Sequence, residues 1–446
     1  MTTSKQPPHN NLGISGKSLY QGRKPSNGAD SVYVQQGTAA KMHKYALMRQ
    51  SARLLHSPEK AAAAQRRTCW CHRGTANATD SISVKRPESG GSARVHGVLT
   101  CKSVWACPVC SGKICAVRQR EISAAMKAHI AQGGYVFLVT RTFPHSVEMP
   151  LAELVEKEAK ARTNFRNSKR WRAGKNARTG YICSLEVTIG ERNGWHPHTH
   201  ELIFATPEAF GEIKEGEGGR LSSRLIDELK EAWYDALRKA GLCERDQMSD
   251  VLAHGLDVRG GQYAAEYVAK FGRDQKWGMS REITAHAAKV GADAKGLHPF
   301  ALLDMVHSGR TDKGLTPDMA ATKFREYVEV FEDKRKRMLS WSKGLKKLLL
   351  NEDEISDEEA ADIDLPEEVT VGFITSEDLS VLQSRYLLPN FLAYVADYCF
   401  DPDQAQAEID DYIAWAKTRQ RSARGDVKVK MWSKGFMYVD RESENV

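Results

Sequence analysis

The sequence has no uninterrupted run of eighteen apolar residues, which a membrane-spanning helix would need. It also has no apolar stretch behind a basic start, the pattern of a secretory signal; its first residues are polar and rich in glycine, serine and asparagine. Neither membrane insertion nor export is therefore expected. We predict a cytoplasmic protein with no membrane partner, in a compartment where thiols stay reduced.

A chain of 446 residues is long enough for two or three domains. Residues 1–40 have few apolar side chains and are predicted to be a disordered tail. We expect a helix and a cysteine-rich segment over 41–116, a central domain over 117–298 and a helical extension over 299–350. An acidic linker at 351–368 and a helical C-terminal region at 369–446 complete the predicted organisation. The order of strand and helix patterns predicts the α+β class with a largely antiparallel sheet.

The net charge of +8 hides an uneven distribution of charge. Residues 351–368 contain ten acidic side chains and no basic one, so the rest of the chain is more basic than the average suggests. A basic surplus of this kind favours a polyanionic partner, usually nucleic acid. The alternative is an ordinary soluble surface that happens to be basic.

Acidic residues are absent between positions 160 and 178, where eight lysines and arginines surround two aromatic rings. Cations that pair with phosphates, interleaved with rings that stack on bases, suit single-stranded DNA. A solvated helix face is the alternative. The predicted DNA-binding residues are Arg162, Arg166, Lys169, Arg170, Trp171 and Arg172.

Six of the nine cysteines lie between Cys69 and Cys115. A Cys-x-x-Cys knuckle at Cys107 and Cys110 presents two thiolates to one tetrahedral Zn²⁺, and earlier cysteines can complete the site. A redox pair is the competing interpretation, but no thioredoxin-like strand and helix accompany this knuckle. We predict a structural zinc site with ligands from Cys101, Cys107 and Cys110 and a fourth from Cys69 or Cys71; Cys115, His72 and His96 are weaker candidates, and a second metal is possible.

Three histidines alternate with other residues from His196 to His200, at the start of an apolar stretch that is typical of a strand. Because strand side chains alternate between faces, His198 and His200 point the same way. Imidazole is a common metal ligand, and a strand holds two rings at a fixed separation. This pattern predicts a metal site.

A predicted helix over residues 262–271 places Tyr263, Tyr267 and Lys270 on one face. Together with a metal on the histidines, a tyrosine hydroxyl could attack a phosphodiester and form a phosphotyrosine. Lys270 could lower the pKa of the phenol or hold a phosphate. The alternative is a pair of tyrosines packed in the core.

These residues resemble the HUH endonucleases: His198-Thr199-His200 is similar to their His-hydrophobe-His motif, and Tyr267-Val-Ala-Lys270 to their Tyr-x-x-Lys motif. Threonine replaces the usual bulky apolar residue. Within that superfamily, residues 42–346 most resemble plasmid rolling-circle replication initiators. Further similar segments are Cys101–Cys110, Gly194–His200, Gly255–Gly260, Phe324–Tyr327 and Trp341–Leu345.

The resemblance implies an HUH nickase domain over 117–298, with a five-stranded antiparallel sheet and the histidines on its central strand. It also implies Mg²⁺ or Mn²⁺ as catalytic ion, with Glu186 as third ligand and His196 as a further candidate. Tyr267 would nick a single-stranded or hairpin origin, stay on the 5′ phosphate and leave a 3′-OH that primes a host polymerase, with a host helicase as further partner.

Position 263 departs from many plasmid initiators, which carry glutamate there to end replication through water. Tyr263 is more similar to the two-tyrosine phage initiators and related transposases, and it is a candidate second nucleophile. Two alternatives to an initiator remain: a rolling-circle transposase and a non-catalytic DNA-binding regulator.

Overall fold

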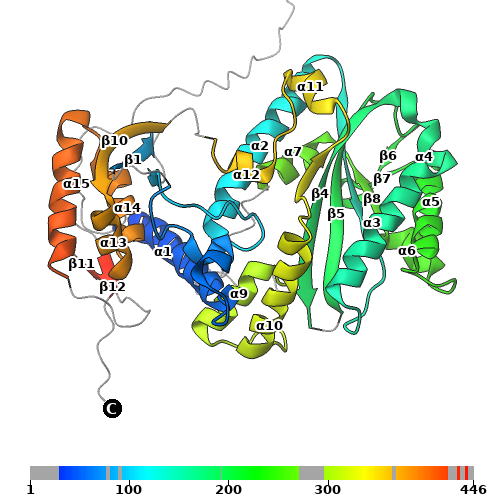
Figure 1. Ribbon diagram of the computed structural model, residues 1–446. Coiled ribbons are helices and arrows are strands. Elements are labelled where there is room, and N and C mark those ends of the chain that lie inside the picture. The colour runs from blue at the N-terminus through cyan, green and yellow to red at the C-terminus, as the bar shows by residue number, and fades with distance from the viewer. Residues whose placement is uncertain are drawn as a thin grey trace, which may run out of the picture.

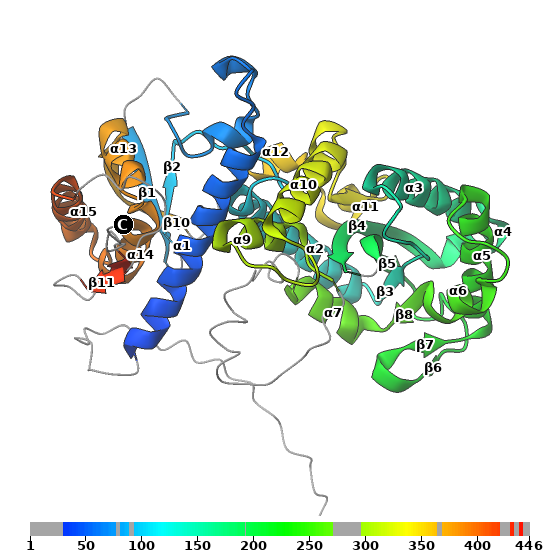
Figure 2. The ribbon, with the colours of Figure 1, turned by 90° about the horizontal axis from the view of Figure 1, so that it is seen from below.

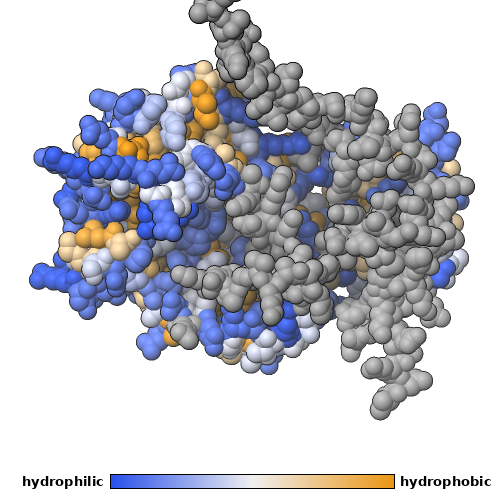
Figure 3. Space-filling view, turned by 180° about the vertical axis from the view of Figure 1, so that it is seen from behind, coloured by the Kyte–Doolittle hydropathy of each residue, from blue (hydrophilic) through white to orange (hydrophobic). Residues whose placement is uncertain are grey.

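The computed structural model describes residues 30–76, 81–88, 93–191, 193–270, 296–363, 368–419, 429–431 and 437–439 (Figure 1). Within these ranges, no helix is long and apolar enough to span a membrane. On the side of the molecule seen in Figure 3, the described surface is mainly hydrophilic, with small scattered hydrophobic groups.

A five-stranded antiparallel sheet forms the centre of the fold, in the order β8-β3-β5-β4-β9. Its strands are β8 (Leu256–Arg259), β3 (Tyr135–Arg141), β5 (Gly194–Ala205), β4 (Arg178–Gly190) and β9 (Leu339–Trp341). The α+β class and the five-stranded antiparallel sheet are therefore confirmed, with the histidines on the central strand β5. The HUH assignment of this sheet stays an expectation.

Strand β5 alternates between its two faces, as a strand must. Thr199 and Glu201 are fully buried, on the face covered by α3 (Leu151–Asn167) and α5 (Arg224–Ala240). The histidines are less buried and lie on the other face, where α7 (Gly261–Lys270) and α2 (Pro108–Ala131) contact the neighbouring strand β3. Figure 2 shows α3 and α5 on one side of the sheet and α7 on the other. The sheet thus separates a closed core from an accessible side.

Short elements connect and extend this unit. They are α4 (Lys169–Ala173), β6 (Lys214–Glu215), β7 (Leu221–Ser222), α6 (Met248–His254), α9 (Pro299–Ser308), α10 (Pro317–Val328) and α11 (Leu345–Leu350). The expected helical extension over 299–350 therefore also supplies β9, an edge strand that pairs with β4.

The two ends of the described chain meet in a second unit, which the sequence did not predict. Strand β10 (Glu368–Thr375) pairs with β1 (Ser81–Pro87), which pairs with β2 (Arg94–His96). Around this sheet lie α1 (Asp30–Leu55), α13 (Ser376–Ser384), α14 (Leu388–Tyr398) and α15 (Pro402–Lys417), and a further hairpin joins β11 (Val429–Met431) to β12 (Met437–Val439).

Two of the predicted segments differ from the elements of the structure. The C-terminal region is not purely helical, and it shares one hydrophobic core with the cysteine-rich segment instead of forming a separate domain. Helix α1 begins at Asp30, inside the expected disordered tail, while residues 1–29 of that tail lie outside the described residues. Strand pairing across almost 300 residues leaves no local pattern in the sequence.

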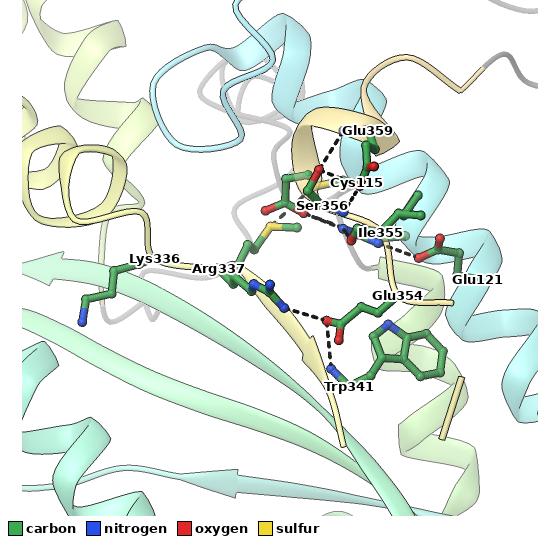
Figure 4. A network of polar contacts seen from close by, with 12 residues as sticks. Cys115, Glu121, Lys336, Arg337, Trp341, Glu354, Ile355, Ser356 and Glu359 are labelled. Carbon is green, nitrogen blue, oxygen red and sulfur yellow. Dashed lines mark hydrogen bonds and ion pairs between the residues drawn. The ribbon is translucent and has the colours of Figure 1, made fainter. Parts of the chain in front are cut away.

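Part of the predicted acidic linker, from Glu354 to Glu359, contacts the central unit, while other acidic side chains of the segment stay exposed (Figure 4). Glu354 accepts hydrogen bonds from the Arg337 guanidinium (3.3 Å) and the Trp341 backbone amide (3.5 Å). Arg118 of α2 donates to the Ile355 carbonyl (2.8 Å) and pairs with Asp357 (2.9 Å). A capping box of Ser356 and Glu359 then starts α12 (Asp357–Ala360). Acidic side chains here neutralise cations of the central unit.

Candidate active site and metal centres

One carboxylate and two imidazoles converge on the accessible face of the sheet. The register of β4 and β5 places Glu186 directly opposite His198. Glu186 Oε2 lies 3.6 Å from Nε2 of His198 and 3.6 Å from Nε2 of His200. The three ligand atoms all lie within 4.8 Å of one another, so they could hold one metal ion.

Hydrogen bonds fix both imidazole rings in the orientation that a metal ligand needs. His200 Nδ1 is 2.9 Å from the hydroxyl oxygen of Thr140 on β3, and His198 Nδ1 is 3.2 Å from the His196 carbonyl oxygen. Each ring therefore turns its Nε2 toward Glu186. Such outer partners set ring orientation and raise ligand basicity. Thr140 gives no signal in the sequence, because its role depends on pairing between β3 and β5.

The pKa values of Glu186, His198 and His200 are shifted by burial and by one another. Burial alone would raise the pKa of Glu186, but His200 and His198, with a hydrogen bond from Tyr267, lower it to about 2. Burial lowers the pKa of His200 to about 4, although the charge of Glu186 opposes it. For His198, burial acts downward, but the contact with Glu186 raises its pKa overall. At neutral pH the group therefore offers a carboxylate and at least one neutral imidazole.

Tyr267 on α7 is in direct contact with this group. Its hydroxyl donates a hydrogen bond of 2.8 Å to Glu186 Oε1, and its ring centre lies 4.8 Å from that of His200. Burial, and then the charge of Glu186, raise the pKa of Tyr267 well above its usual value. The Tyr267 phenol therefore lies beside the candidate metal ligands but stays protonated. A cation bound to the same carboxylate would lower the pKa of the phenol.

The other two predicted residues of α7 are placed differently. The Tyr263 ring packs on Gly219, where a Cβ would lie 1.8 Å from the ring, and under the Arg259 guanidinium at 5.3 Å. These contacts do not bring Tyr263 to Glu186, and they match the packing alternative. Lys270 ends the helix, and its side chain lies outside the described residues.

Further histidines surround the group. The His196 ring lies 4.4 Å from that of His145, centre to centre, and His196 is not part of the three-residue ligand group. His298, which sequence reasoning missed, caps α9 by accepting a hydrogen bond from the Phe300 amide (3.2 Å). Burial lowers the pKa of His298 to about 3, and the charges of Glu186 and His198 reach it. An antiparallel bridge between Leu297 and Ile189 of β4 brings the segment of His298 to the sheet. This contact joins segments that are distant in the sequence.

Four buried thiols form a second candidate metal centre. Cys71, Cys101, Cys107 and Cys110 all lie within 4.8 Å of one another. The separations of their sulfur atoms are 3.5 Å, 3.6 Å and 3.8 Å for the closest pairs. Zinc–sulfur bonds of about 2.3 Å at tetrahedral angles would place the sulfurs about 3.8 Å apart. The donor set and geometry therefore fit Zn²⁺.

The fourth predicted ligand is thereby selected between the two alternatives. Cys69 lies outside the cluster, with its thiol 3.6 Å from the Ala52 carbonyl oxygen, and Cys71 takes the position instead. Cys115 also lies outside, 3.9 Å from the Met338 sulfur. Cys69 and Cys71 are two residues apart at a short 3₁₀ helix, and only the thiol of Cys71 faces the knuckle.

The predicted DNA-binding stretch needs correction. Trp171 is only 7% exposed and packs on Phe165, so its ring cannot stack on bases. Arg166 pairs with the buried Glu201, and Arg162 with Glu158 (3.3 Å). Burial would raise the pKa of Glu201, but Arg141 and Arg166 lower it to about 2, so these arginines balance an interior charge.

The remaining cations of that stretch face solvent. Arg170 is partly engaged by Glu231 (2.7 Å), and Arg172 donates to the Asn167 side chain (2.8 Å). Lys169 is exposed. A role of these three residues in DNA binding stays a prediction. Trp171, the ring expected to act with them, is buried.

Comparison with known proteins shows what the chain that carries these sites is similar to. Residues 92–216 match the model of the family described as Replication protein. The chain is 27% identical over 328 residues to a Streptomyces lividans protein named Protein rep, covering 62% of this chain and 69% of that protein. It is 30% identical over 184 residues to a Streptomyces cyanogenus protein named Neomycin resistance protein, covering 34% of this chain and 41% of that protein.

No solved structure matches the chain. The sequence matches confirm the predicted resemblance to Rep replication proteins. The family match spans the knuckle cysteines and the histidine strand, and it ends before α7 with Tyr267.

Proposed function

We propose that this relative of the Rep replication proteins is a rolling-circle replication initiator, which binds origin DNA and nicks one strand. The contact between the Tyr267 hydroxyl and Glu186 carries the proposal, because it joins a nucleophile to a candidate metal ligand. The protein would act in the cytoplasm on single-stranded or hairpin DNA.

In the proposed reaction, Tyr267 Oη attacks the phosphorus of the scissile phosphodiester. The bond from phosphorus to the 3′ oxygen breaks, the phenol loses its proton, and the leaving oxygen gains one. The products are a 5′-phosphotyrosine and a free 3′-OH, which would prime a host polymerase while a host helicase opens the duplex. Attack of a 3′-OH on the phosphotyrosine, the reverse step, would rejoin the displaced strand.

Glu186, His198 and His200 would hold a divalent cation, Mg²⁺ or Mn²⁺, which supplies polarisation of the phosphodiester when bound. Two imidazoles beside one carboxylate suit Mn²⁺ better than Mg²⁺, which prefers oxygen ligands alone. Lys270 is proposed to lower the pKa of the phenol or to hold a neighbouring phosphate. The thiols of Cys71, Cys101, Cys107 and Cys110 would hold a structural Zn²⁺.

Two other functions fit the structure less well than an initiator does. A two-tyrosine transposase would need Tyr263 beside the same phosphate, and the Tyr263 ring instead contacts Gly219 and Arg259. A non-catalytic DNA-binding regulator would not need Tyr267 in contact with a group of metal ligands. These observations favour the initiator.

The test compares two matched variants, Tyr267→Phe and Tyr263→Phe, each of which removes one hydroxyl from the same helix. With a single-stranded origin fragment and Mn²⁺, we expect Tyr267→Phe to form no covalent adduct on a denaturing gel. Its fold should be retained, since one hydrogen bond contributes only about 1 kcal/mol. Tyr263→Phe should form the adduct at the wild-type yield.

An adduct at full yield from Tyr267→Phe would show that Tyr267 is not the nucleophile. The second-nucleophile prediction for Tyr263 is tested in the same samples by counting closed single-stranded circles over several rounds. A lower circle yield from Tyr263→Phe, with a normal first nick, would support that role. An unchanged yield would assign Tyr263 to packing.

A further inference from the structure

A cavity of about 630 Å³ lies in the unit that contains the cysteine cluster. It is lined by parts of α1, β2 and the start of α2, and by the loop that follows β2. One carboxylate lines it, that of Asp362, whereas the basic residues that line it are Lys41, Lys44, Arg67, Arg94, Lys102 and Lys113. Among the described residues that line the cavity, six are lysine or arginine and one is acidic.

Nearby groups balance part of this charge. Arg94 pairs with Glu368 at 2.6 Å, and Lys102 pairs with Asp362. Lys44 sits close to the cysteine cluster, and its Nζ packs against Gly112, where a Cβ would lie 2.1 Å from it. Four thiolates around Zn²⁺ carry two negative charges, which Lys44 offsets in part. Arg67 donates a hydrogen bond to the Thr100 carbonyl oxygen (3.4 Å).

Lys41 and His72 are buried groups of the cavity lining. Burial lowers the pKa of Lys41 to about 7; Arg94 and Lys44 act in the same direction, and Asp397 opposes them. The His72 side chain is 6% exposed, and its Nδ1 has no hydrogen-bond partner in the described part of the chain. Cations gathered in a recess, together with an unpaired buried donor or acceptor, suit a ligand with several oxygen atoms and negative charge.

One exposed apolar side chain in the lining favours DNA over a small anion: Leu99 is 41% exposed. Trp70, three residues along the chain from Arg67, does not line the cavity but is 39% exposed. Exposed aromatic rings add base stacking to the phosphate contacts of nearby cations when nucleic acid binds. This is the pairing that the sequence suggested for residues 160–178, where the tryptophan is buried.

Helix α2 connects the cavity to the active site. Lys113 lines the cavity, and Gln119, six residues further along α2, donates a hydrogen bond of 2.9 Å to the Val268 carbonyl beside Tyr267. Six residues of α-helix span about 9 Å. The cavity and the active site are therefore linked by less than two turns of one helix.

We propose that this basic cavity binds phosphate groups of the origin DNA, at a site separate from Tyr267 and its metal ligands. The inference rests on the proposed function and deepens it: the cavity would hold DNA next to the nicked segment and so help to set which phosphodiester reaches Tyr267.

Binding is tested with a fluorescein-labelled single strand of mixed sequence, by anisotropy over a range of salt concentrations. The protein is the full chain carrying Tyr267→Phe, without added divalent metal, so that no cleavage occurs. The cavity variant is Arg67→Gln with Lys113→Gln. The matched control, Arg224→Gln with Lys239→Gln, removes the same charge from exposed positions on α5, on the far side of the sheet.

We expect the cavity variant to bind more weakly and to lower the slope of log affinity against log salt by about 2, one per lost phosphate contact. The control should keep the wild-type slope. Equal losses in both variants would show that overall charge, and not the cavity, attracts DNA. Unchanged binding in the cavity variant would also overturn the proposal.

A second pair of variants predicts a change in the opposite direction. Asp362→Asn releases Lys102 toward the cavity and should tighten DNA binding, whereas Asp353→Asn, an 89% exposed residue of the same acidic segment, should not. Equal affinities for Asp362→Asn and Asp353→Asn would contradict the proposal. Inorganic phosphate is added as competitor and compared with an inert salt. If both displace the labelled strand at the same ionic strength, the cavity is a DNA site. Displacement at much lower phosphate concentration would indicate a small-anion site instead.

These measurements are independent of the proposed chemistry. Loss of binding in the cavity variant, with no adduct formed by the wild-type protein, would leave the DNA site standing and remove the nickase. If the wild-type protein forms an adduct and the cavity variant binds DNA normally, the nickase is supported and the DNA site in the cavity is overturned.

Discussion

The two candidate metal centres differ in burial, in donor atoms and in the segments that supply them. Four sulfur atoms, all buried, come from positions 71–110 and enclose one tetrahedral space. Glu186, His198 and His200 come from two paired strands, are half-buried, and have the hydroxyl of Tyr267 beside them. A closed set of four protein ligands is typical of a structural metal, whereas three ligands on an accessible face leave positions for a substrate.

The surroundings of the two centres differ in the same way. The cysteine cluster belongs to the core that joins α1, β1 and the C-terminal helices, so any change there disturbs packing between distant parts of the chain. The histidine group lies on the sheet, whose opposite face holds the closed core. A rigid sheet can keep its geometry when one ligand is changed. The two centres should therefore respond differently to substitution.

The largest effect is expected at the thiol centre. Cys107→Ser should lose the bound metal and lower the melting temperature and solubility, because metal binding to such sites stabilises the fold by several kcal/mol. Cys69→Ser is the matched control, since this buried cysteine lies two positions from a ligand but outside the cluster. Elemental analysis and thermal melting measure both. If the Cys107→Ser protein lacks metal but keeps wild-type stability, the metal at the thiol centre has no structural role.

A smaller effect is expected at the histidine centre. Glu186→Gln keeps the size of the side chain and an oxygen that can accept from Tyr267, so the melting temperature should change little. Its Mn²⁺ affinity should fall about 10- to 100-fold, measured by calorimetric titration. Glu191→Gln, at the turn after β4, should bind Mn²⁺ normally. A large loss of stability in Glu186→Gln would show that both centres are structural.

The smallest effect is a dependence of Mn²⁺ stabilisation on pH at the histidine centre. The pKa of His198 is raised by Glu186, and a protonated imidazole cannot bind a metal. Without metal, the contribution of this ion pair to stability is present below the ordinary histidine pKa and is lost as pH rises through the raised value. Stabilisation by added Mn²⁺ should therefore increase from about pH 6 to about pH 8. A melting shift that is constant over this range would contradict the assignment of His198 as a ligand.

Local patterns in the sequence predicted the parts of the site that a single element carries. Alternation along a strand placed His198 and His200 on one face, and the spacing of Cys107 and Cys110 predicted a knuckle. Glu186 was expected from the resemblance to HUH endonucleases, and the strand register places it opposite His198. Trp171 shows the limit of such reasoning, because a ring among cations is equally consistent with a stacking platform and with a core residue.

The sequence by itself determined the α+β class, the histidine strand and the thiol knuckle, because backbone geometry repeats every two residues in a strand and about every 3.6 in a helix. Tertiary structure alone decided the rest: that Cys71 and not Cys69 completes the thiol cluster, that His298 approaches Glu186, and that β10 pairs with β1. It also buried Trp171 and left Trp70 exposed. The physical reason is that these outcomes depend on which distant segments pack together, and packing is set by the whole core at once.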